Sequence, residues 1–216
     1  MLTTDADIAR IESHAFIEAQ HAGQRLSRGS ASISGSTLTG LGVDVPFDAA
    51  GIAPGHVCVV DGQTYEVVER TGPSTLVISR VRRGAQDAPQ PPSPVTNRPL
   101  HIVSFVPQRG IAHAQVMRSI GIEPDLPPDA RAGLPGVESI LNPGSLARLE
   151  ALAALRLIWL SASLNAGADA GVSMRADRYR EMYEQERVGI GAFLDLDGDG
   201  LPDAIRRPGV MQLTRA

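Results

Sequence analysis

The feature that most constrains the fold is the dipeptide Asp61-Gly62, which stands between two runs of β-forming residues. The first run, residues 56–60, is rich in valine, and the second, residues 64–69, contains threonine, tyrosine and valine. Asp-Gly favours the two-residue turns that connect antiparallel strands, so this pattern predicts a β-hairpin. Gly72-Pro73 predicts the next turn, and residues 75–81 predict a third strand.

The β pattern extends on both sides of this hairpin. Residues 29–106 contain short β-forming runs for about five strands, which predicts a small antiparallel β-barrel or sandwich. Within it, residues 84–99 carry five prolines and are expected to form an extended loop, because proline lacks the N–H that a sheet interior needs. Residues 1–28 place apolar side chains at helical spacing after Thr4 and Asp5, which predicts an N-terminal helix.

Residues 107–216 have a helical pattern. Asn142-Pro143 is a typical helix start, with asparagine as the cap, and the Leu/Ala-rich run after it is expected to bury a broad face. Ser173 is the expected cap of the next helix, and the short Ala/Gly loop between the two helices predicts an antiparallel hairpin. The side chains expected to pack these helices, within a subunit or between subunits, are Leu152, Leu155, Trp159, Tyr179 and Tyr183.

The predicted fold class is therefore α+β. A small β-barrel or sandwich is inserted after an N-terminal helix and is followed by a helical hairpin with an extended tail. Only 4% of the residues are aromatic, so the core must be built mainly from aliphatic side chains, and contacts between subunits are a plausible supplement to its stability.

Composition excludes several classes of protein. All 20 basic residues are arginine, so the chain can hold neither a Walker A lysine nor a Schiff-base lysine. Its single cysteine, Cys58, excludes an internal disulfide framework and a cysteine-rich zinc site. The formal net charge of −4 does not favour binding of free nucleic acid. We expect a cytoplasmic protein without membrane contact, because no export pattern is visible and Arg156 interrupts the longest apolar stretch.

An acidic motif near the C-terminus resembles the front of a calcium-binding loop. Carboxylates at alternate positions can converge on a hard cation, and a glycine at the sixth position permits the sharp turn. The candidate ligands for Ca²⁺ are Asp195, Asp197, Asp199 and Asp203. The twelfth position, where a bidentate glutamate belongs, is Arg206, a change that weakens calcium binding. The alternative is a tight turn in which the aspartates accept backbone N–H groups.

The chain ends in a segment that is apolar and cationic and too short to fold alone. Its glycine and proline forbid a continuous helix, and we expect residues 205–216 to dock on a partner protein. The residues expected to make this contact are Ile205, Arg206, Arg207, Val210, Met211, Leu213 and Arg215.

Two further groupings of polar side chains carry weaker signals. His14, Glu18 and His21 share one face of the expected N-terminal helix and could begin a transition-metal site, but a solvated helix face is the preferred interpretation. His56 and Cys58 share a strand face and could form a thiol–imidazole pair, but a cysteine inside a valine-rich strand is expected to be buried and poorly activated.

The β segment contains one tight basic cluster. Arg80, Arg82 and Arg83 could touch a phosphate backbone, yet no aromatic platform accompanies them in the sequence. We expect solvated charge at a strand end or a contact with another protein.

The order of motifs in the last half of the chain resembles the head–tail adaptor (connector) proteins of tailed bacteriophages and gene transfer agents. The matching elements are the run at residues 158–163, Tyr179-Arg180, Tyr183-Glu184, the acidic motif at residues 195–200 and the ending at residues 213–215. The β segment at residues 29–106 is an addition to that pattern.

This resemblance implies a non-enzymatic structural protein of the virion neck that is assembled in the bacterial cytoplasm. It implies a ring of twelve copies that binds the portal protein through its C-terminal segment and contacts a stopper or tail protein. DNA would pass through the ring without sequence recognition, and no cofactor is implied. The alternatives are a stopper or tail-completion protein, in which a β-barrel usually dominates, a calcium-dependent binding module, and a hydrolase that uses Cys58 and His56.

Overall fold

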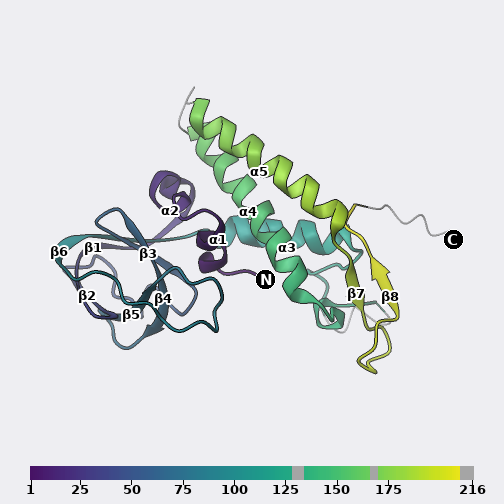
Figure 1. The fold of residues 1–216 in the computed structure, drawn as a ribbon, viewed down its shortest axis with the longest axis horizontal. Coiled ribbons are helices and arrows are strands. Elements are labelled where there is room, and N and C mark those ends of the chain that lie inside the picture. The colour runs from purple at the N-terminus through teal and green to yellow at the C-terminus, as the bar shows by residue number, and fades with distance from the viewer. Residues whose placement is uncertain (128–133, 166–169, 210–216) are drawn as a thin grey trace.

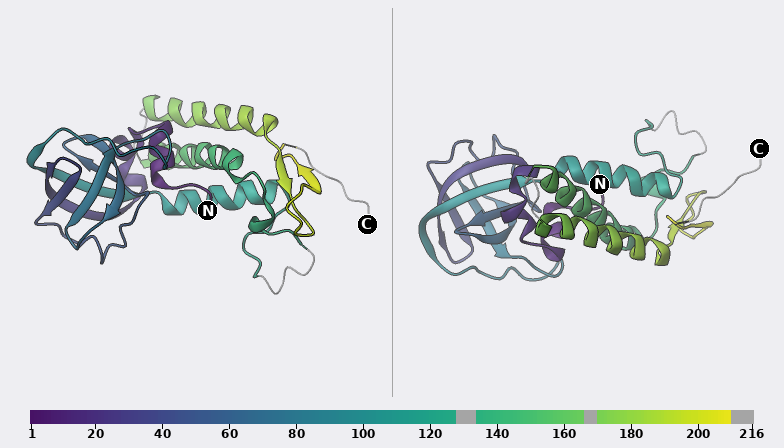
Figure 2. Two further views of the ribbon diagram at one scale, coloured as in Figure 1. Left: turned by 60° about the horizontal axis from the view of Figure 1, so that its bottom comes forward. Right: turned by 90° about the horizontal axis from the view of Figure 1, so that it is seen from above.

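The computed structural model describes residues 1–127, 134–165 and 170–209 of the chain. A β-barrel forms one end of an elongated molecule, a helical body forms the middle, and a small β-hairpin forms the other end (Figures 1 and 2). The expectation of an α+β chain with a small antiparallel β unit and a C-terminal helical region is confirmed.

Six antiparallel strands close the barrel in the order β1-β2-β5-β4-β3-β6, and β6 pairs with β1. The predicted hairpin connects β3 and β4, where Asp61 and Gly62 both have positive φ, at 51° and 75°. That conformation suits the right-handed twist of the two strands. The strands are β1 (Gln24–Ser34), β2 (Thr37–Leu41), β3 (Val57–Val60), β4 (Gln63–Arg70), β5 (Thr75–Arg80) and β6 (Val95–Ser104).

The predicted loop at residues 84–99 is wrong for its last five residues, because β6 begins at Val95 and contains Pro99. Pro99 pairs with Ser30 of β1, while its carbonyl accepts a hydrogen bond of 3.0 Å from the N–H of Asp61. In an antiparallel strand, the N–H and the carbonyl of one residue point toward the same neighbour. An N–H at position 99 would therefore point toward the turn after β3 and not toward β1. Because no hydrogen bond to β1 is lost, proline is tolerated at this position.

The single N-terminal helix predicted for residues 1–28 is also wrong. Residues 5–22 form three short pieces, α1 (Asp5–Ile11), α2 (Ala15–Glu18) and the 3₁₀ helix η1 (Gln20–Ala22), and β1 already begins at Gln24. Thr4 caps α1 as expected, in a capping box with Asp7. The break between α1 and α2 is stabilised from outside, because the hydroxyl of Tyr179 donates to Glu12 at 2.9 Å.

The helical body contains α3 (Val106–Ser119), the 3₁₀ turn η3 (Val137–Ser139), α4 (Pro143–Asn165) and α5 (Ala170–Gly189). α4 lies against both α3 and α5, and α4 and α5 run in opposite directions (Figure 2).

The side chain of Asn142 does not cap α4. It binds the carbonyl of Gly191 and the N–H of Phe193 instead. Ser173 lies inside α5, which begins three residues earlier than predicted.

The five side chains predicted to pack the helices lie in the core of the subunit itself. Leu152, Leu155 and Trp159 have no exposed surface, and the two tyrosines of α5 are almost fully buried. The guanidinium of Arg175 lies 4.6 Å from the centre of the Trp159 ring and also pairs with Glu18, so it joins α5 to α4 and α2. A contact between subunits of an oligomeric ring would therefore have to use other residues of these helices.

Buried charged groups connect the barrel to the helical body. The carboxylate of Asp5, with no exposed surface, accepts from the hydroxyl of Ser104 at 2.6 Å and the N–H of Phe105 at 3.1 Å. The same carboxylate forms an ion pair with Arg109, whose Nε lies 3.2 Å away. α1 is thereby fixed to the end of β6 and to the first turns of α3.

A second buried carboxylate, Glu150 of α4, holds the residues before α1. It accepts from the hydroxyl of Thr3 at 2.7 Å and the N–H of Leu2 at 3.1 Å, and it lies 2.7 Å from Nδ1 of His113. Arg109 links the two carboxylates, because it also donates to the carbonyl of Thr3 at 2.6 Å. We call the set Thr3, Asp5, Ser104, Arg109, His113 and Glu150 the N-terminal clasp.

Asp5→Ala tests the clasp. The variant leaves the guanidinium of Arg109 buried without its carboxylate, so we expect the free energy of unfolding to fall by about 3–5 kcal/mol. Urea denaturation measures this change. Asp177→Ala, which removes the exposed partner of Arg180 on α5, is the control and should change stability by about 1 kcal/mol or less. Equal effects of the two substitutions would contradict the role given to the clasp.

Candidate functional site

The hairpin of β7 (Ala192–Leu194) and β8 (Ala204–Arg206) lies at the opposite end of the molecule from the barrel (Figure 1). Its strands follow the period of two expected for a half-buried sheet. Ala192 and Leu194 point into the core, whereas Phe193 points outward and pairs in register with Ile205. This hairpin was not among the elements predicted from the sequence.

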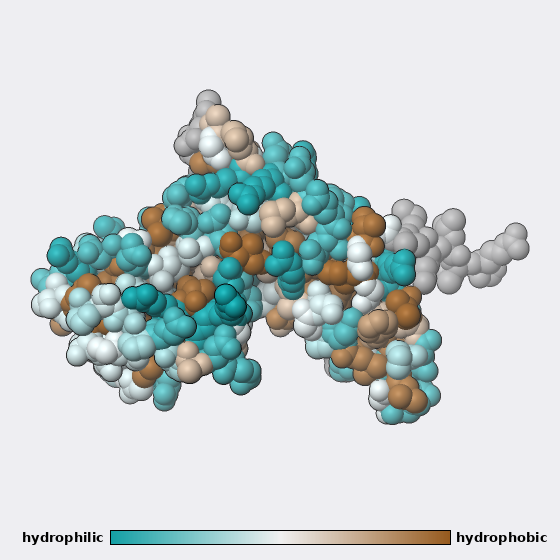
Figure 3. Space-filling model, viewed as in Figure 1, coloured by the Kyte–Doolittle hydropathy of each residue, from teal (hydrophilic) through white to brown (hydrophobic). Residues whose placement is uncertain are grey.

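Exposed apolar side chains gather on and beside this hairpin (Figure 3). Two come from the outer face of the strands and two from the loop between them, and the fifth precedes α4 and is held to β7 by a backbone hydrogen bond. We call this set the hairpin patch. Its members, with their exposed fractions, are Leu141 (41%), Phe193 (39%), Leu196 (50%), Leu201 (64%) and Ile205 (56%).

The structure corrects part of the predicted docking tail. Ile205 and Arg206 belong to β8 and are not in an extended tail. The guanidinium of Arg206 donates to the carbonyls of Ile120 and Gly121, both at 3.0 Å, and so satisfies the end of α3. Arg207 is exposed, while Val210, Met211, Leu213 and Arg215 lie outside the described residues.

The acidic loop connects β7 to β8, and its carboxylates build the turn. Asp195 accepts from the N–H groups of Gly198 at 2.7 Å and Gly200 at 2.9 Å. Asp203 accepts from the N–H of Leu196 at 2.6 Å, and Asp197 and Asp199 each accept from the N–H two residues later. This pattern agrees with the turn interpretation of the sequence.

The same loop also brings three carboxylates together. Oxygens of Asp195, Asp197 and Asp203 lie within 4.8 Å of one another, an arrangement that a hard cation can use. Asp199 is not part of this group, and Arg206 in the twelfth position points to α3. Calcium binding by this loop stays a prediction, and calorimetry with calcium would test it.

The other predicted groupings are not assembled. Among the described residues, only the acidic loop brings together three side chains that could hold a metal ion. His14 pairs with Glu12, whereas Glu18 pairs with Arg175 of α5. Cys58 is fully buried, and burial raises the pKa of its thiol to about 12, so the thiol stays protonated at neutral pH. Nδ1 of His56 contacts the backbone of Ala53.

The three arginines of the predicted basic cluster, Arg80, Arg82 and Arg83, have different surroundings in the structure. β5 ends at Arg80, so Arg80 and Arg82 do not share a strand face as predicted. All three arginines line a cleft at the barrel mouth, but only Arg82 also pairs with buried Glu66, at 2.7 Å. Within the described residues, no helix is long and apolar enough to cross a membrane.

Comparison with known proteins found no family model, no curated protein and no solved structure that matches this chain.

The pKa of Asp195 gives a test of the loop. The N–H groups of Gly200 and Gly198 stabilise the ionised carboxylate and hold its pKa below the ordinary value of about 3.9. The folded loop is therefore stabilised above that ordinary pKa and loses this stabilisation as pH falls through the lowered one. In NMR titrations, the amide protons of both glycines should shift with a midpoint below about 3.9. Asp195→Asn should remove the transition, and a midpoint at or above the ordinary value would contradict the bonding described.

Proposed function

We propose that this protein is a head–tail adaptor of a tailed bacteriophage or gene transfer agent. In this proposal it forms a homo-oligomeric ring of twelve copies between the portal and the tail, contacts a stopper or tail protein, and lines the channel through which DNA leaves the virion. The observation that carries the proposal is the hairpin patch at one end of the molecule.

The hairpin patch supports assembly because large apolar side chains gain stability when another chain covers them. Full burial of one such side chain contributes about 1.5–3 kcal/mol relative to full exposure. Five of them at one end, each between 39% and 64% exposed, form the kind of surface that marks a protein interface. In a ring, the neighbouring copy would cover this surface on every subunit in turn.

The course of the chain supports contact with the portal at the same end. The described chain ends at Gly209, which lies beside Arg187 in the last turn of α5. The last described residue therefore lies near the hairpin, and Arg207, two residues before it, is exposed. We assign portal binding to Arg207, Val210, Met211, Leu213 and Arg215, which places the hairpin end toward the portal and the barrel away from it.

A stopper protein is the second candidate, and the closed six-stranded barrel favours it. The two candidates differ in their direct partner. An adaptor binds the portal, whereas a stopper binds the adaptor ring and not the isolated portal. Binding of the purified protein to the portal alone therefore separates them.

Ring formation is the first test of the adaptor proposal. Electron microscopy of the protein mixed with the portal of the same virus should show twelve-fold rings. The double variant Leu201→Ser, Ile205→Ser removes two members of the hairpin patch and should weaken assembly at least about tenfold, a change of about 1.4 kcal/mol. Leu41→Ser, at a residue of the barrel that is 41% exposed, is the matched control and should assemble normally. A protein that stays monomeric at every concentration with the portal present would contradict the proposal.

The C-terminal segment gives a second test. Removing residues 210–216 leaves β8 and the contacts of Arg206 in place, so the melting temperature should not change. Binding to the immobilised portal should fall about tenfold or more, since several apolar contacts would be lost together. Unchanged portal binding by the shortened protein would rule out the docking role.

A further inference from the structure

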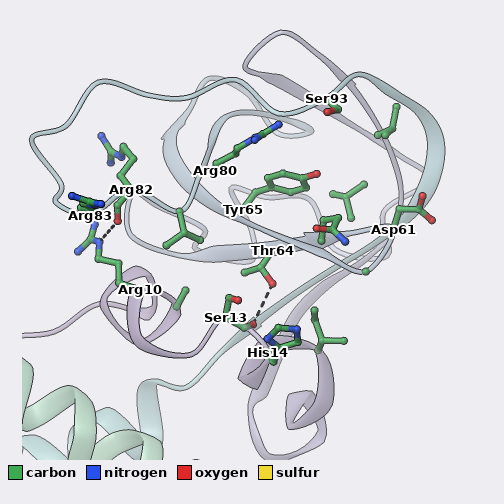
Figure 4. Close-up of a pocket in the computed structure, with 17 residues that line it drawn as sticks. Arg10, Ser13, His14, Asp61, Thr64, Tyr65, Arg80, Arg82, Arg83 and Ser93 are labelled. Atoms are coloured by element: carbon green, nitrogen blue, oxygen red, sulfur yellow. Dashed lines mark hydrogen bonds between the residues drawn. The ribbon is translucent and has the colours of Figure 1, made fainter.

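A cleft of about 840 Å³ lies at one mouth of the barrel, beside the N-terminal helices (Figure 4). Its walls come from the β3–β4 turn, the start of β4, the end of β5 and the segment from α1 to α2. Barrel mouths are common places for small-ligand sites, because the strands hold the surrounding side chains rigidly. The hairpin patch lies at the other end of the molecule, so the cleft is separate from the surface assigned to ring assembly.

The inward-facing row of β5 ends in a charged residue at this mouth. Leu76 and Ile78 are fully buried in the barrel core, and the next residue with the same orientation is Arg80. In the register of the sheet, Arg80 stands opposite Tyr65 of β4. Side chains directly opposite on antiparallel strands share a face, which brings the guanidinium and the phenol side by side at the cleft.

Two of the four arginines that line the cleft are neutralised. Arg82 and Arg10 both contact the buried carboxylate of Glu66, at 2.7 Å and 3.3 Å, and Arg10 also pairs with Asp7. Among the described residues, neither Arg80 nor Arg83 has a carboxylate within ion-pair distance. The carboxylate that lines the cleft, Asp61, lies 3.7 Å from the guanidinium of Arg98. The cleft therefore has an excess of positive charge.

Tyr65 supplies a neutral donor beside this charge. The residue is only 8% exposed, yet it lines the cleft, and its hydroxyl has no hydrogen-bond partner among the described residues. Burial raises the pKa of the phenol, so it stays protonated and can donate. A hydroxyl that has no protein partner and lies beside a cleft can donate a hydrogen bond to an acceptor that binds there.

We propose that the barrel mouth binds a phosphate ester, with Arg80 pairing with the phosphate oxygens and the hydroxyl of Tyr65 donating to one of them. The planar guanidinium matches the spacing of two phosphate oxygens, and the phenol adds a third donor. Arg83 contributes further positive potential along the cleft. A volume of about 840 Å³ accommodates a ligand of nucleotide size. The phosphate belongs either to a free nucleotide or to a single-stranded nucleic acid.

Calorimetric titrations test this site and distinguish its two sources of phosphate. The probes are inorganic phosphate, a nucleoside monophosphate and an eight-nucleotide single-stranded DNA. Arg80→Gln should weaken binding about tenfold or more, and Tyr65→Phe, which removes only the hydroxyl, should weaken it several-fold. Arg25→Gln removes the same charge from the barrel outside the cleft and is the matched control, because Arg25 is 62% exposed and pairs with Asp44. Circular dichroism checks that all three variants are folded.

Tight binding of the monophosphate identifies a nucleotide site, whereas tight binding of the oligonucleotide alone identifies a nucleic-acid backbone. Either result supports the proposal if the effects of Arg80→Gln and Tyr65→Phe exceed that of Arg25→Gln. Absence of binding at millimolar concentrations of every probe would overturn it. Equal losses in Arg80→Gln and Arg25→Gln would also overturn it, because they would show attraction by the overall charge of the barrel. Failure here leaves the adaptor proposal untouched, since the two rest on opposite ends of the molecule.

Discussion

The buried carboxylates of Asp5 and Glu150 join the N-terminal segment to the end of β6, to α3 and to α4. A carboxylate without exposed surface is costly unless hydrogen bonds and opposite charge satisfy it, and both of these groups are satisfied by partners from distant parts of the chain. The barrel, α1, α3 and α4 are therefore joined by buried polar contacts as well as by apolar packing. Apolar contacts alone would stabilise their association but would fix its geometry less specifically.

This junction determines where the two candidate surfaces lie. α1 contacts the barrel on its other side, where Ala6 donates to the carbonyl of Gly55 at 2.9 Å and Arg10 donates to the carbonyl of Arg82 at 2.8 Å. The N-terminal helices thus become one wall of the cleft at the barrel mouth. At the far end, Arg206 and Asn142 hold the hairpin to α3 and α4. The hairpin and the barrel mouth are thereby held at opposite ends of one subunit.

The features that could be predicted from the sequence are those decided by neighbouring residues. Asp61-Gly62 determines its own turn, and the Leu/Ala-rich run after Asn142-Pro143 determines a helix with an apolar face. Predictions failed where distant contacts decide the outcome. At the break after Ile11, Glu12 accepts a hydrogen bond from Tyr179, and in β6 the carbonyl of Pro99 accepts one from Asp61 in the turn after β3.

The same distinction between contacts of neighbouring residues and contacts of distant residues applies to the candidate sites. The acidic loop could be predicted because its turns use only neighbouring residues. The role of Arg206 could not, because the carbonyls that it satisfies lie 85 and 86 positions away in the chain. The aromatic partner of Arg80 could not be predicted from the sequence, because Tyr65 is brought beside it only by the register of β4 and β5. The alternation of Leu76, Ile78 and Arg80 was the available signal.

The most direct test of the central claim is an electron cryomicroscopy reconstruction of the virion neck. If the proposal holds, we expect twelve copies of this chain in a ring that touches the portal directly, with the β7–β8 hairpins toward the portal and the barrels away from it. A neck without this chain, or one in which the barrels face the portal, would contradict it.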